Sequence, residues 1–282
     1  MYTRSVRCLN ATGFHNMVYH EWGRRDNPRV LICVHGLARN SRDFDELALA
    51  LSQDYRVICP DLVGRGESDW LPEGQAYNMP LYLNDMTTLL ARLNVDSVDW
   101  IGTSMGGLIG ICLAALPNSP IKRLVLNDIG AYVPAAALQR ISEYLGDKHF
   151  HSLSEVEQYM RQTYLSFKHL TDEQWRHVAK YGSRLQEKGT YALHYDPAIA
   201  QATKENSTEA VDLWPLWSAI QVPQLLIWGE ESDVLLEDTV QVMAENKQLT
   251  LFSIPGIGHV PSLMEGFQIE RVQTWLQEQS DN

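Results

Sequence analysis

The stretch GTSMG at residues 102–106 decides the fold of this chain. It follows a short apolar run at 98–101 and precedes an apolar sequence with helical spacing at 105–116. A strand that turns sharply into a helix at a serine has this G-x-S-x-G pattern. The two glycines are needed because neighbouring backbones approach too closely for a Cβ, and the turn projects the serine hydroxyl outward. The pattern therefore makes Ser104 the candidate nucleophile, with the positive end of a helix behind it.

Short apolar runs on both sides of this turn predict the other strands of a sheet. They are nearly continuous, as in strands covered on both faces, and they occupy residues 30–34, 56–59, 124–126, 225–228 and 249–254. Between most of them, apolar residues three and four positions apart predict helices at 43–53, 80–93, 105–116, 237–246 and 264–279. Residues 5–9 and 17–22 flank Thr12-Gly13 and predict an antiparallel hairpin at the sheet edge. The alternation predicts the α/β fold class, with a doubly wound, mostly parallel sheet.

The interval from 131 to 222 lacks a clear core strand. Amphipathic sequences predict helices at 134–145, 154–167 and 171–185, with a capping box that starts at Ser154 and another helix start at Thr171. A helical block inserted between two strands is expected to lie over the carboxyl edge of the sheet, where such folds place their ligands. We therefore expect a core in two parts, residues 1–133 and 214–282, and a helical cap at 134–213. The alternative is an insertion that makes no contact with a site.

A serine hydroxyl needs a base to act as a nucleophile. Among the nine histidines, His259 lies in a loop after the last predicted strand and before the last predicted helix. That loop is expected to end over the turn at Ser104, so His259 is the candidate base; the alternative is a buried, satisfied imidazole. His35 directly follows the strand at 30–34. We expect the His35 loop to supply backbone N–H groups rather than a base.

The base in turn needs a carboxylate that holds its tautomer and stabilises the imidazolium. Asp233, in the loop after the next-to-last predicted strand, is the preferred acid, because it lies farthest into that loop. Glu230 and Glu231 of the same loop are expected to be solvent-exposed charges. Asp128 is the alternative acid, because it follows the preceding strand and can also reach the imidazole. The preferred order along the chain is nucleophile, acid and base.

These motifs together resemble the α/β-hydrolase superfamily, in particular its capped, lipase-like branch. The resemblance covers nearly the whole chain, and it is carried by HGL at 35–37, DLVGRGES at 61–68, the turn at 102–106, and the loops of Asp233 and His259. It implies an oxyanion hole formed by the backbone N–H groups of Leu37 and Met105. It also implies that the 61–68 loop is mainly scaffold, with Arg65 tied to local carboxylates.

The branch that this chain resembles includes carboxylesterases, lactonases, carbon–carbon bond hydrolases, haloperoxidases and epoxide hydrolases. A serine nucleophile argues against the epoxide hydrolases, which have an aspartate in its place. We expect a carboxylesterase that cleaves small to medium acyl esters through an acyl-enzyme, with no metal and no organic cofactor. The alternatives are a lactonase, a carbon–carbon hydrolase of the meta-cleavage-product type and a catalytically silent ligand-binding fold. The sequence VPSL at 260–263 lacks the tryptophan usual in the meta-cleavage enzymes.

The composition excludes several other classes of protein. The net charge of −12 disfavours binding to nucleic acid and to anionic membranes. The four cysteines have no metal-type spacing and suit a reducing compartment. Neither a signal peptide nor a membrane-spanning run is evident, so we expect a soluble, cytoplasmic protein whose partner is a small-molecule ester. The sequence leaves the oligomeric state open.

Overall fold

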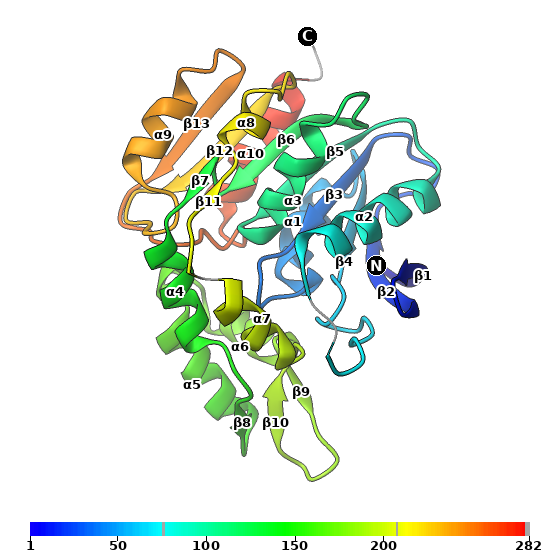
Figure 1. Cartoon of the computed structure of the whole chain (residues 1–282), viewed down its shortest axis with the longest axis vertical. Helices are drawn as coiled ribbons and strands as arrows, with labels where there is room; N and C mark the ends of the chain where they lie inside the picture. The colour runs from blue at the N-terminus through cyan, green and yellow to red at the C-terminus, as the bar shows by residue number, and fades with distance from the viewer. Residues whose placement is uncertain (75–76, 207, 280–282) are drawn as a thin grey trace.

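A computed structural model describes residues 1–74, 77–206 and 208–279 of the chain. Its centre is an eight-stranded sheet with the order β1-β2-β4-β3-β5-β6-β12-β13 (Figure 1). The strands are β1 (Tyr2–Asn10), β2 (Gly13–Trp22), β3 (Val30–Val34), β4 (Arg56–Pro60), β5 (Val98–Thr103), β6 (Ile121–Asn127), β12 (Gln224–Gly229) and β13 (Leu249–Ile254). All neighbours from β4 to β13 pair in parallel, whereas β1 and β2 form an antiparallel hairpin at the edge. The predicted α/β class, parallel sheet and edge hairpin are thus confirmed.

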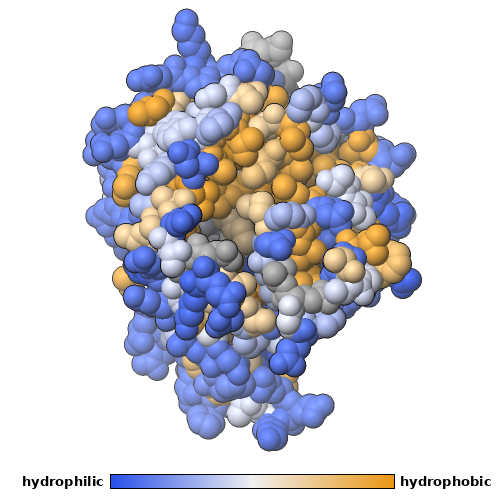
Figure 2. Space-filling view, in the orientation of Figure 1, coloured by the Kyte–Doolittle hydropathy of each residue, from blue (hydrophilic) through white to orange (hydrophobic). Residues whose placement is uncertain are grey.

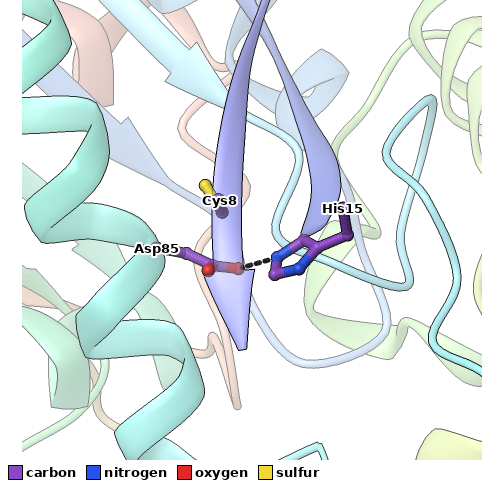
Figure 3. A group of neighbouring side chains, drawn as sticks. All are labelled: Cys8, His15 and Asp85. Carbon is purple, nitrogen blue, oxygen red and sulfur yellow. Dashed lines mark hydrogen bonds and ion pairs between the residues drawn. The ribbon is translucent and has the colours of Figure 1, made fainter. Parts of the chain in front are cut away.

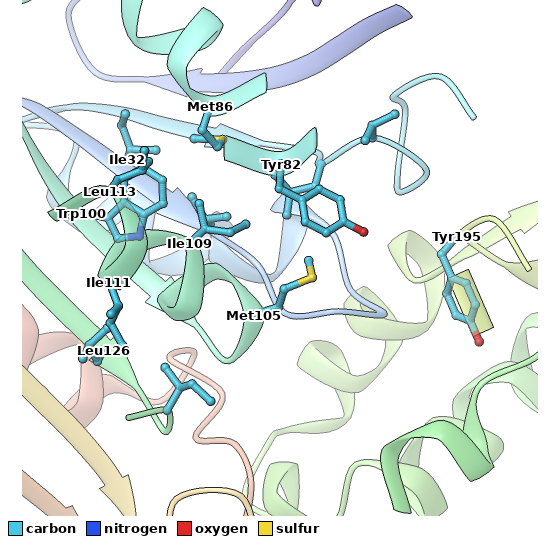
Figure 4. Close-up of a cluster of buried hydrophobic side chains, with 14 of the residues drawn as sticks. Ile32, Tyr82, Met86, Trp100, Met105, Ile109, Ile111, Leu113, Leu126 and Tyr195 are labelled. Atoms are coloured by element: carbon cyan, nitrogen blue, oxygen red, sulfur yellow. The ribbon is translucent and has the colours of Figure 1, made fainter. Parts of the chain in front are cut away.

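Side chains alternate along each central strand and divide the core between the two faces of the sheet. In β3, Val30, Ile32 and Val34 pack into one core cluster, and Leu31 and Cys33 pack into the other. The first cluster is covered by α2 (Met79–Leu93), α3 (Met105–Ala114) and α9 (Glu237–Ala244). Figure 4 shows part of this cluster. The second is covered by α1 (Asp45–Leu51), which follows the 3₁₀ turn Ser41–Phe44, and by α10 (Gly266–Glu278). Burial on both faces explains why these strands are continuously apolar in sequence.

A long segment between β6 and β12 lies at one end of the sheet (Figure 1). We call the part from α4 to α7 the inserted segment. Its helices are α4 (Ala135–Tyr144), α5 (Leu153–Thr163), the 3₁₀ turn Leu165–Phe167, α6 (Asp172–Tyr181) and α7 (Ala198–Asn206). A small sheet joins β8 (His149–Phe150), β9 (Ser183–Leu185) and β10 (Tyr191–Leu193). None of these short strands belongs to the central sheet, as the sequence predicts for this interval.

The inserted segment leaves and rejoins the core through a pair of short strands. β7 (Tyr132–Val133) precedes it, and β11 (Val211–Asp212) follows it; the two pair antiparallel with Val211 opposite Val133. The chain then enters α8 (Trp214–Trp217), which contacts α3. Strand pairing thus joins the entry of the segment to its exit. Of the helices described in the structure, none has both the length and the apolar character that a bilayer crossing requires.

The helix starts in the inserted segment test two predictions. Thr171 caps α6 in a capping box with Gln174, so this predicted start is confirmed. The predicted start at Ser154 is wrong, because Ser152 caps α5 by accepting the N–H of Glu155. In both helices the capping hydroxyl accepts the N–H of the residue three positions ahead. In α5 that hydroxyl belongs to Ser152, two residues before the predicted cap.

Candidate active site

Ser104 lies at the sharp turn between β5 and α3. Its backbone has a φ of 50° and a ψ of −114°, a strained conformation for a residue with a Cβ. A Cβ on Gly106 would lie 2.1 Å from the carbonyl oxygen of Val34, and one on Gly102 would lie 2.4 Å from the backbone of Gly106. The glycines therefore allow the close backbone approach that the sequence pattern predicts.

His259 reaches Ser104 from the loop between β13 and α10. Its Nε2 lies 3.0 Å from Ser104 Oγ, and its side chain is only 10% exposed. The hydrogen bonds next to His259 include one from the Val260 N–H to Ser166 Oγ at 3.0 Å and one from Asn127 Nδ2 to the Pro261 carbonyl at 2.9 Å. Ser166 belongs to the inserted segment, so both the core and this segment position the imidazole.

Asp128 completes a chain of hydrogen bonds that begins at Ser104. Its Oδ2 lies 2.7 Å from His259 Nδ1, and its carboxylate is fully buried. It also accepts from the Gly229 N–H at 2.8 Å and from the Ser232 hydroxyl at 2.6 Å. An ionised carboxylate only accepts hydrogen bonds, so Nδ1 of His259 carries the proton and Nε2 is left to accept from the serine hydroxyl.

The prediction that Asp233 contacts the histidine is wrong in this structure. Its carboxylate is 48% exposed and pairs with Arg140 of α4, whose Nη2 donates to Oδ1 at 2.9 Å. After β12 the chain turns so that the Ser232 N–H bonds to the Gly229 carbonyl, and Ser232 rather than Asp233 then faces Asp128. The alternative acid, Asp128, therefore occupies the position predicted for Asp233.

His35 plays a structural part at the base of the same region. It is buried, and its Nε2 accepts the Leu62 N–H at 3.0 Å. Burial disfavours the charged imidazolium and lowers the pKa of His35 to about 4. The neutral ring links the loops that follow β3 and β4, because its Nδ1 bonds to the Gly36 carbonyl and its Nε2 to the Leu62 N–H rather than to Ser104. This placement agrees with the expectation that His35 is not the base.

The two residues expected to form an oxyanion hole flank the serine. Leu37 and Met105 line the same cavity as Ser104, and Met105 begins α3, where the backbone N–H groups have no partner within the helix. Arg65 lies behind both. Its fully buried guanidinium donates to the Leu37 carbonyl at 2.9 Å and to Tyr82 Oη at 2.8 Å, and it lies 3.8 Å from Met105 Sδ.

The prediction that Arg65 is tied to local carboxylates is therefore wrong. Within the described ranges, its side chain bonds to carbonyls, a hydroxyl and a thioether, and it forms no ion pair. The carboxylate of Asp61 instead accepts backbone N–H groups of Ser41 and Glu67. A guanidinium buried beside the expected oxyanion hole places positive charge where an anion would form.

Ser104 lies where two cavities meet. The larger, about 350 Å³, is mainly apolar and is lined by α2, α3, α4, α7 and β11. The smaller, about 70 Å³, contains His259 together with Arg39, Tyr164 and Ser166. Leu37 and Ile141 line both. Figure 2 shows apolar side chains gathered over α3 and its neighbours, with a hollow in the same face. Figure 4 shows Tyr82 and Met105, which line the larger cavity, pointing into the same space.

The roles of several residues at the site were not predicted from the sequence. Ser232, Asn127 and Arg65 contact the site through hydrogen bonds that no motif specifies. The only signal for them is position: Asn127 immediately precedes Asp128, and Arg65 lies in the glycine-rich stretch after β4.

Comparisons with known proteins show the family to which the chain belongs. A model of the alpha/beta hydrolase fold family matches residues 29–265, and the chain belongs to that family. Over 275 residues it is 44% identical to a 3-hydroxybutyrate-oligomer hydrolase of Cupriavidus necator, with 94% of each chain covered. A solved alpha/beta hydrolase from Novosphingobium aromaticivorans is 33% identical, with a TM-score of 0.86 and 98% of each chain covered. A 2-(acetamidomethylene)succinate hydrolase of Mesorhizobium japonicum is 24% identical, with 82% of this chain and 81% of its own length covered.

Proposed function

We propose that this chain is a serine hydrolase that cleaves ester bonds in short oligomers of 3-hydroxybutyrate. The observation that carries the proposal is the continuous series of hydrogen bonds from Ser104 through His259 to the buried Asp128. Ser104 lines both cavities, so a substrate in either one can reach its hydroxyl. The substrate class is suggested by the 44% identical 3-hydroxybutyrate-oligomer hydrolase, which matches over 94% of both chains. The proposal retains the expected esterase chemistry and replaces Asp233 by Asp128 as the acid.

The mechanism follows from the contacts. His259 Nε2 accepts the proton of Ser104 as Oγ attacks the ester carbonyl, and Asp128 stabilises the imidazolium that forms. The N–H groups of Leu37 and Met105 bind the oxyanion, and each such donor typically lowers the barrier by about 3–4 kcal/mol. His259 then returns the proton to the departing alcohol. Water, deprotonated by the same imidazole, hydrolyses the acyl-enzyme and regenerates the serine.

The two cavities give the substrate a direction. The departing alkoxide must lie beside His259 to receive its proton, and His259 lines the smaller cavity and not the larger one. We therefore place the alcohol portion in the smaller cavity and the acyl portion in the larger, apolar one. In this proposal the inserted segment acts as a cap, because Ile141 and Ile199 contribute to the cavity walls. The small alcohol cavity predicts release of a single hydroxyacid unit from the carboxyl end of an oligomer.

The test is hydrolysis of 3-hydroxybutyrate dimer and of a trimer isotopically labelled in its carboxyl-terminal unit. The wild-type chain should release labelled monomer first, and Ser104→Ala should release none. A p-nitrophenyl ester series from acetate to dodecanoate, a lactone and a vinylogous diketone serve as competing substrates.

Three outcomes separate the alternatives. Faster turnover of the diketone than of any ester would replace the proposal with carbon–carbon hydrolysis. Preference for the lactone would replace it with lactonase activity. A folded chain that neither hydrolyses any of these substrates nor reacts at Ser104 with an organophosphonate would be a silent binding fold.

A further inference from the structure

Three side chains with metal-ligating atoms meet at the edge of the sheet, where the hairpin packs on α2 (Figure 3). Cys8 and His15 lie directly opposite each other in the pairing of β1 with β2, so their side chains share one face of the hairpin. Asp85 projects towards them from α2. A ligand atom of each residue lies within 4.8 Å of those of the other two. None of the three lines a cavity at Ser104.

The cluster is buried and incompletely satisfied. Cys8 and Asp85 are 0% exposed and His15 is 5% exposed. His15 Nε2 lies 2.8 Å from Asp85 Oδ2, but Asp85 Oδ1 and His15 Nδ1 have no hydrogen-bond partner among the residues that the structure describes. Across the described residues, His15 is the only ion-pair partner of Asp85, and no lysine or arginine forms one. A buried carboxylate with an unpaired oxygen is costly, and a cation bound beside it would remove that cost.

We propose that Cys8, His15 and Asp85 form a binding site for one Zn²⁺ ion. Zinc takes thiolate sulfur, imidazole nitrogen and carboxylate oxygen at about 2.0–2.3 Å, so tetrahedral ligands stand roughly 3.3–3.8 Å apart. The ligand atoms lie within 4.8 Å of one another, so they would have to approach by up to about 1–1.5 Å, and a solvent molecule would supply the fourth ligand. The thiolate and carboxylate charges balance the charge of the ion, while the imidazole stays neutral. Binding breaks the Cys8 S–H bond, forms a zinc–sulfur bond and releases one proton to solvent.

The site would have a structural effect. It would cross-link the two strands of the edge hairpin to α2, whose Tyr82 lines the larger cavity one turn before Asp85. The metal would therefore stabilise the hairpin and fix the helix that forms one cavity wall. It takes no part in the chemistry at Ser104, so this proposal does not depend on the proposed function.

The test uses the full-length chain, stripped with a chelator and titrated with Zn²⁺ alone. We expect one zinc per chain by elemental analysis and a melting temperature that rises by several degrees. Co²⁺ in place of zinc should give a thiolate-to-metal charge-transfer band with the visible bands of a tetrahedral site. Cys8→Ser should lose that band and at least about 100-fold in zinc affinity, and His15→Gln is the second variant. Cys112→Ser, at a half-buried cysteine of α3, is the matched control that keeps the site.

Two results would overturn the zinc site. One is a folded chain that takes up no stoichiometric zinc; the other is equal zinc affinity in the wild type and in Cys8→Ser. Either result would leave the cluster as a hydrogen-bonded link between the hairpin and α2. Ester hydrolysis, measured on the chelated protein, reports separately on Ser104, because that chemistry requires no zinc.

Discussion

Asp128 and Asp233 provide a matched pair of tests at the scale of single residues. Asp128→Asn should lower kcat by roughly 10³–10⁴-fold, because an amide in place of the carboxylate favours the wrong tautomer of His259. Asp233→Asn should change kcat by less than about twofold, since Asp233 is half exposed and forms a surface ion pair with Arg140. The kcat values of the two variants, measured on the same ester, decide which of the two carboxylates is the catalytic acid. A large loss in the Asp233 variant with an active Asp128 variant would restore the assignment made from the sequence.

The choice between these two acids shows where sequence reasoning reaches its limit. Both follow strands that are neighbours in the sheet, β6 and β12, so each can reach the imidazole in principle. The turn after β12 decides the outcome, because it directs Ser232 inward to donate to Asp128 and leaves Asp233 outside. A one-residue difference in a loop carries no periodic signal. Ser104 and His259 were predictable because strand, turn and loop order fix their places.

Arg65 should support the proposed oxyanion hole without touching substrate. Arg65→Met would remove the donor to the Leu37 carbonyl and the positive charge beside Met105, so we expect kcat to fall about 10–100-fold with little change in KM. Arg65→Lys keeps the charge and should lose less. Because buried acceptors lose their donor, stability should also fall by about 3 kcal/mol.

The readout that separates positioning from general destabilisation is binding of an alkylboronate transition-state analogue. Its affinity should fall in parallel with kcat in Arg65→Met, measured well below the melting temperature. Product affinity should stay near the wild-type value. An unchanged boronate affinity would mean that Arg65 acts only on stability.

At the scale of elements, the turn between β5 and α3 depends on Gly106. A Cβ there would lie 2.1 Å from the Val34 carbonyl oxygen, so Gly106→Ala should lose roughly 3–5 kcal/mol of unfolding free energy or displace α3. Gly266→Ala is the matched control, because a Cβ at this first residue of α10 meets no atom of the described residues within 4 Å. It should be neutral or stabilise by up to about 1 kcal/mol. Denaturant unfolding measures both, and a Gly106 variant as stable as wild type would contradict the steric argument.

The elements differ in how far the sequence predicts them. β3 and β13 have the predicted bounds of 30–34 and 249–254, because turn-forming or polar residues border these hydrophobic runs. The predicted helix at 171–185 instead ends at Tyr181, and residues 183–185 form β9. Strands of two or three residues are too short to show alternation. They form here because distant segments of the inserted segment provide pairing partners, a tertiary effect.

At the scale of the whole molecule, the site assembles residues from distant parts of the chain. Ser104 and His259 are 155 positions apart, and both follow strands whose carboxyl ends meet at one edge of the sheet. The order of α/β elements therefore predicted their meeting. The cavity walls depend instead on how α4 and α7 lie against that edge, and no local pattern encodes this packing. Substrate selection is thus the property least accessible to sequence reasoning.

The stability of the whole fold should fall in acid because of His35. Its pKa is lowered from 6.5 to about 4 in the fold, so between these values the unfolded chain binds more protons than the native one. Stability from this group is therefore complete above about pH 6.5, declines as the pH falls towards 4 and levels off below it. The shift corresponds to about 3 kcal/mol.

Because carboxylates also titrate in this range, the measurement is the difference between the unfolding free energies of wild type and His35→Gln from pH 7 to pH 4. Glutamine can still accept the Leu62 N–H but does not titrate, so the wild type should lose more stability over this range. Parallel pH dependences would show that His35 is readily protonated in the folded protein.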